Sequence, residues 1–96
     1  MRYFHRTSLA PDAVLEESDR YFQTRVALAD SGPRHRVYRG PIGQIDVRVR
    51  AEGGHYTHIT VETDQVGESE ADKVGKRFLT EVHRRVEPSH QARGAY

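Results

Sequence analysis

Four side chains near the middle of the chain have the chemistry and the spacing to bind an anion together. They alternate along two segments that are typical of β-strands, and alternate residues of a strand share one face of a sheet. Arginine presents forked donors to phosphate or carboxylate, while aromatic rings stack on bases or hold arginine by cation–π contact. The predicted basic-aromatic patch consists of Arg48, Arg50, Tyr56 and His58.

Whether two more side chains belong to the patch depends on the orientation of the preceding strand. Arg36 and Tyr38 join the patch if Val37 points inward, and the short connection at residues 40–43 leaves that orientation open. The same patch also has two other interpretations. Tyr and Arg are enriched in protein interfaces, and an open antiparallel sheet needs a polar outer face in any case.

Other motifs predict neither catalysis nor a metal or cofactor site. His55 and His58 are three residues apart on a strand and therefore point to opposite faces. The segment 67–71 lacks the second glycine of a nucleophile elbow, and Ser69 is expected to cap a helix. Residues 40–43 have the spacing of a GxxG nucleotide clamp, but they join two strands and therefore predict a hairpin turn.

Composition narrows the class of protein. The 96 residues include no Cys, carry a formal net charge of +1, and are 35% hydrophobic and 30% charged. Roughly 60–65% of the unfolded surface can be buried at this length, which suffices for one small core. A charge so close to zero argues against generic nucleic-acid binding. No segment approaches the ~20 apolar residues of a membrane span, and the first residues lack a secretory signal, so we expect a cytoplasmic protein.

Hydrophobic periodicity predicts the elements that hold these residues. A short strand over 2–7, with Phe4 facing inward, precedes an amphipathic helix over 11–29. Pro11 suits the first helical position, and residues 30–33 end the helix. Strands follow over 35–39, 44–51 and 55–63, and a second helix begins near Ser69 and stops at Glu87-Pro88. We expect residues 1–88 to form one domain and 89–96 a flexible tail.

The apolar alternation of the last two strands predicts how they pair. A three-residue loop at 52–54 sets Val47 opposite Ile59 and, on the other face, Arg48 opposite His58. A slip of one residue would turn the apolar side chains to the polar face, so burial selects against it.

The order β-α-β-β-β-α predicts an α+β fold in which two helices pack on one face of a three- to four-stranded antiparallel sheet. This order resembles that of double-stranded-RNA-binding domains and, with its first strand, of ribosome-hibernation factors, although Glu70 and Asp72 stand where such an RNA-binding helix presents Lys. The first strand, residues 10–14 and the long last helix resemble a shortened helix-grip ligand carrier. These resemblances concern element order and identify no family.

We therefore expect a non-enzymatic interaction module that self-associates or docks on a larger protein assembly through the Arg/Tyr sheet face. Only 20 Ile, Leu, Val and Phe residues are available for a core, so a partner would add buried surface. RNA or polyanion binding through the same face is the first alternative. A small hydrophobic-ligand carrier with a helix-grip-like pocket is the second.

Overall fold

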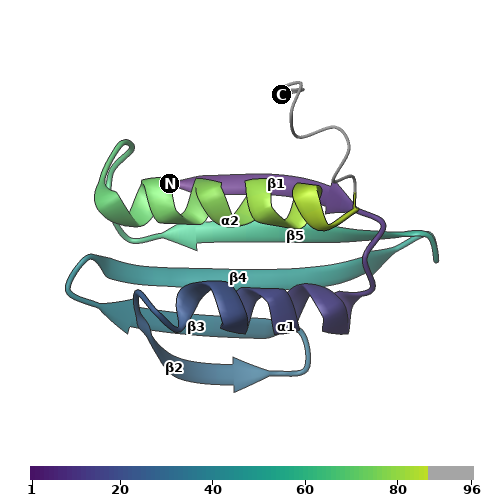
Figure 1. The fold of residues 1–96 in the computed structure, drawn as a ribbon, viewed down its shortest axis with the longest axis horizontal. Coiled ribbons are helices and arrows are strands. Elements are labelled where there is room, and N and C mark those ends of the chain that lie inside the picture. Colours follow the sequence, from purple (N-terminus) through teal and green to yellow (C-terminus); the bar gives the residue numbers. More distant parts are fainter. Residues whose placement is uncertain (87–96) are drawn as a thin grey trace.

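The computed structural model describes residues 1–86, which form a five-stranded antiparallel sheet with both helices on one face (Figure 1). The spatial order of the strands is β1-β5-β4-β3-β2. Along the chain the elements are β1 (Arg2–Thr7), α1 (Pro11–Phe22), β2 (Ala27–Gly32), β3 (His35–Gly40), β4 (Gly43–Glu52), β5 (Tyr56–Thr63) and α2 (Glu70–Val86). The predicted α+β class is confirmed, but the sheet has five strands instead of the three to four expected. The predicted tail at 89–96 lies outside the described residues.

The additional strand, β2, occupies residues that the sequence assigns to the end of the first helix (27–29) and to the turn that follows it (30–32). α1 ends at Phe22 because the chain turns there: the backbone N–H groups of Arg25 and Val26 both donate to the Phe22 carbonyl, at 2.8 and 2.9 Å. Val26 then enters the core against Gly40, where a Cβ would lie 3.0 Å from the Val26 side chain. Most β2 side chains are exposed, so pairing with β3, rather than apolar alternation, defines this edge strand.

The first strand pairs with β5 and faces the opposite way from the prediction. Tyr3 and His5 point toward the helices, and the Tyr3 hydroxyl donates to the carboxylate of Asp72 at the start of α2. Phe4 therefore lies on the outer face and is 60% exposed. The prediction that Phe4 faces inward is wrong because the strand pattern does not reveal the buried carboxylate that Tyr3 binds.

The hairpin between β4 and β5 buries the predicted faces but in a different register. Val47 lies opposite Val61 rather than Ile59, and Arg48 lies opposite Thr60 rather than His58. The two registers differ by two residues, so they bury the same side chains and the alternation cannot separate them. The loop is residues 53–55, whose two glycines have φ values of +62° and +76°.

α2 begins as the sequence predicts. The Ser69 hydroxyl accepts a hydrogen bond of 3.1 Å from the backbone N–H of Asp72. Gly75 brings this helix close to β5, since a Cβ there would lie 3.0 Å from the Val61 side chain. The space between the helices and the sheet is filled by buried side chains, of which the largest aromatic ones are Tyr38, Phe22 and Phe78.

The inward orientation of β1 places a histidine against α2. The His5 ring lies 6.3 Å from the His83 ring, between centroids. Burial, followed by the nearby charge of His83, lowers the pKa of His5 below its ordinary value of 6.5. The unfolded chain therefore binds a proton at His5 more readily than the folded chain does, and stability rises with pH between the folded pKa and about 6.5.

We predict that His5→Gln reduces the loss of folding stability on acidification. Urea unfolding at about pH 7.5 and about pH 5.5 measures this loss in the wild type and the variant. His55→Gln, in the exposed β4–β5 loop, is the matched control and is expected to keep the wild-type difference. An unchanged difference in His5→Gln would show that His5 does not contribute to the pH dependence.

Candidate functional site

The structure brings together the first four residues of the predicted basic-aromatic patch. They lie on the outer face of the sheet, which is the face away from both helices. Arg48 and Arg50 lie on β4, and Tyr56 and His58 lie on β5. Arg50 pairs directly with His58 across the strands. Arg36 and Tyr38 do not join them, because β3 turns these two side chains toward the helices.

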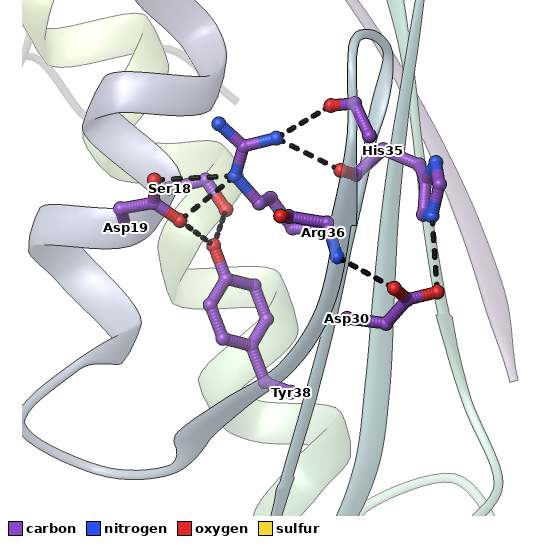
Figure 2. A network of polar contacts seen from close by, with 8 residues as sticks. Ser18, Asp19, Asp30, His35, Arg36 and Tyr38 are labelled. Carbon is purple, nitrogen blue, oxygen red and sulfur yellow. Dashed lines mark hydrogen bonds and ion pairs between the residues drawn. The ribbon is translucent and has the colours of Figure 1, made fainter.

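Tyr38 faces inward because its ring and its hydroxyl both find partners there. The ring lies 4.8 Å from that of Phe22, between centroids. The hydroxyl donates to Asp19 at 2.7 Å and lies 2.6 Å from the Ser18 hydroxyl, as Figure 2 shows. Burial raises the pKa of Tyr38 far above its ordinary value, and the hydrogen bond to Asp19 raises it further, against the opposing effect of the Ser18 bond.

Arg36 is committed to contacts within the fold. Its Nε donates to both carboxylate oxygens of Asp19, at 3.1 and 3.2 Å. Its Nη1 donates to the backbone carbonyls of Gly32 and His35, at 2.7 and 2.9 Å. The side chain is only 19% exposed. Arg36 therefore connects α1 to the β2–β3 hairpin instead of facing a ligand (Figure 2).

This polar network has the residue types of a catalytic site, but both of its hydroxyl-bearing residues are buried. Ser18, whose hydroxyl bonds to that of Tyr38, is completely buried. The raised pKa of Tyr38 keeps its hydroxyl protonated, so it is a hydrogen-bond donor to Asp19 rather than a base. The network therefore positions α1 on β3.

The outer face contains a hollow of about 380 Å³, which we call the cationic hollow. It spans β3, β4 and β5, and its floor follows the strand register: His35 lies opposite Arg48, which lies opposite Thr60. Its lining residues are Arg34, His35, Arg48, Val49, Arg50, His58 and Thr60. Sequence reasoning missed Arg34, His35 and Thr60, since their membership depends on the orientation of β3 and on the register of β5.

The basic side chains of the hollow differ in how far acidic side chains pair with them. Arg50 forms an ion pair with Glu52 at 3.3 Å, and Arg34 forms one with Asp12 at 3.3 Å. His35 lies 3.5 Å from Asp30. Arg48 is exposed, and within residues 1–86 its guanidinium has no hydrogen-bonding or ion-pair partner. The donors of Arg48 are therefore available to an oxygen-rich anion.

Aromatic side chains lie next to the cationic hollow. The Phe4 ring, on β1, lies 5.4 Å from the His58 ring at an angle of 41°. Arg6 lies over the Tyr56 ring at 5.7 Å and also pairs with Glu52 at 2.9 Å. Desolvation raises the pKa of Glu52, but the Arg6 charge and the hydrogen bond from Arg50 outweigh this effect and lower it below the ordinary value. Glu52 thus forms ion pairs with both Arg6 and Arg50 at the rim of the cationic hollow.

Other chemistry has little support in the described part of the chain. His55 lies in the β4–β5 loop and not at the start of the strand as predicted, whereas His58 lies on the outer face of β5. Among residues 1–86, no group of three or more His, Cys, Asp or Glu side chains could hold a metal ion.

Comparisons with known proteins add no identity. No family model matches the chain, and no significant match was found among curated proteins or among solved structures. None of the helices within the described residues has the length and apolar character needed to cross a membrane.

We predict that Tyr38→Phe destabilises the fold by about 1–3 kcal/mol, because it leaves the buried Ser18 hydroxyl without its partner. Urea unfolding measures this change. Tyr56→Phe removes the same atom from the outer face, where its hydroxyl has no partner among the described residues, and should change stability by less than about 0.5 kcal/mol. Equal effects of the two substitutions would contradict this role of Tyr38.

Proposed function

We propose that the chain is a non-enzymatic binding module that takes an anionic partner on the outer face of its sheet. One observation carries the proposal. The cationic hollow is lined by three arginines and two histidines, and none of its lining residues within the described chain is acidic. Since the whole chain has 14 acidic and 15 basic residues, this grouping is a local segregation of charge.

The donors of the hollow fit the oxygens of a phosphate or carboxylate. Arg48 has no described partner, and the Arg50 side chain is 69% exposed. Both can swing toward a ligand while β4, which carries them, stays paired with β3 and β5. The hydroxyl of Thr60 adds a neutral hydrogen-bonding group between the cations and β1. A preformed cluster of this kind favours an anion with several oxygens over a single monovalent ion.

Charge also favours an anionic partner over self-association through this face. Stacking the outer faces of two copies would bring two cationic hollows into one interface and remove the unpaired Arg48 guanidiniums from water. Burying a charge without a partner is costly. Most carboxylates near the hollow already pair with an arginine or a histidine of their own chain, namely Glu52, Glu62 and Asp30. Asp46 is the exception and bonds to the Gln44 side chain, so these carboxylates offer little compensation.

We predict that replacing Arg48 and Arg50 together by Gln weakens the binding of inorganic polyphosphate about tenfold or more. The slope of log affinity against log salt concentration should become shallower by about one unit for each arginine–phosphate ion pair that the substitutions remove. Fluorescence competition over a range of salt concentrations measures both quantities.

The matched control removes two cations from the solvent-exposed face of α2. Lys73→Gln with Arg77→Gln changes the net charge by the same amount as the outer-face variant. It should leave polyphosphate binding within about twofold of the wild type. Equal losses of affinity in the two double variants would attribute binding to net charge alone and would overturn the proposal. Sedimentation of the wild type as a stable dimer that the outer-face variant abolishes would also overturn it in favour of self-association.

A further inference from the structure

We infer that the anionic partner is a single-stranded nucleic acid, with bases stacked on Phe4 and Tyr56 and phosphate oxygens bound in the cationic hollow. This inference rests on the proposed function and specifies its ligand. It depends on two exposed rings that simple anion binding does not require.

The first support is the exposure of these two rings. Phe4 is 60% exposed and Tyr56 is 52% exposed, although both lie on a face that is otherwise mainly polar. Phe4 contacts the His58 ring, which itself lines the cationic hollow. The apolar surface is thus continuous with the phosphate-binding groups. Aromatic rings on an open sheet, beside arginines, are the arrangement with which proteins hold unpaired bases.

The second support is the strand register. One row across the sheet consists of Phe4, Thr60, Arg48 and His35, on β1, β5, β4 and β3. Phe4 and Arg48 are two strand spacings apart, which is about 10 Å. A base on Phe4 and a phosphate at Arg48 can therefore belong to the same or to neighbouring nucleotides.

Tyr56 provides a separate stacking position. It lies four residues before Thr60 on β5, and hence about 13 Å along the strand from the row that contains Phe4. The two rings are too far apart to share one base, so they suit different bases of an extended strand. Between them lies the row of Arg6, His58 and Arg50. Its two arginines share the Glu52 carboxylate and keep further N–H donors for the backbone of such a strand.

The arrangement favours a single strand over the other polyanions. In a duplex the bases are covered by their stacked neighbours, so exposed rings gain no contact with them. An acidic peptide or inorganic polyphosphate would pair with the arginines but would leave both rings unused. Removing the two rings should therefore weaken the binding of a single strand and leave the binding of the other polyanions unchanged.

The test measures the affinity of the wild type for a fluorescent oligouridylate of about ten nucleotides, a length within the usual site size of such surfaces. The double variant Phe4→Leu with Tyr56→Leu keeps apolar side chains on β1 and β5 but removes the rings. We expect it to bind the oligouridylate about tenfold or more weakly, with the salt dependence unchanged. Its affinity for inorganic polyphosphate should stay within about twofold of the wild type.

An abasic strand of the same length provides the matched ligand control, because it keeps the phosphates and lacks the bases. The wild type should bind it as weakly as the ring variant binds the oligouridylate. Heteronuclear NMR spectra that retain their dispersion confirm that each variant is folded.

The outcomes separate this inference from the proposed function. If the ring variant binds the oligouridylate like the wild type, or if the abasic strand or an oligoglutamate of equal charge binds as tightly, a nucleic-acid strand is not the partner, and the anion-binding proposal stands. If the Arg48→Gln, Arg50→Gln variant binds every probe like the wild type, the proposed function itself is wrong.

Discussion

Two tyrosine–aspartate hydrogen bonds fix the orientation of the strands on which the outer face depends. Tyr3 of β1 donates to Asp72 of α2, and Tyr38 of β3 donates to Asp19 of α1. Each bond joins a strand to the helix that lies over it, and both aspartates are held by further donors. Because side chains alternate along a strand, an inward-facing tyrosine determines which face of the sheet each of the remaining side chains of that strand occupies.

The outer face follows from these two bonds. With Tyr3 inward, Phe4 must face solvent, and with Tyr38 inward, His35 must do so as well. These two residues are the ends of the row whose centre is Thr60 and Arg48. Polar contacts on the helix side of the sheet therefore determine which aromatic and cationic side chains meet on the opposite side.

Local periodicity predicts much of the fold from the sequence. It fails where the orientation or pairing of a strand depends on a residue far away in the sequence. The stripe of α2, its Ser69 cap and the buried face of β4 and β5 follow from spacing. The orientation of β1 and β3 does not, because the aspartates that hold Tyr3 and Tyr38 lie 69 and 19 residues away. β2 escapes prediction for the same reason, since an exposed edge strand carries no apolar alternation and is defined by its pairing with β3.

The same polar contacts reconcile a nearly neutral chain with a cationic surface. Several carboxylates accept hydrogen bonds within the fold. Asp19 and Asp72 accept from the inward-facing tyrosines, and Asp64 accepts from the backbone N–H of Gln44 at 2.9 Å. Hydrogen bonds from the Gln44 backbone and from the Gln65 side chain lower the pKa of Asp64, so it stays ionised to lower pH than an ordinary aspartate. Arg36 is used for internal contacts in the same way, but Arg6, Arg48 and Arg50 lie on the outer face. The net charge averages over both faces of the sheet, so it is a poor guide to the kind of ligand that either face binds.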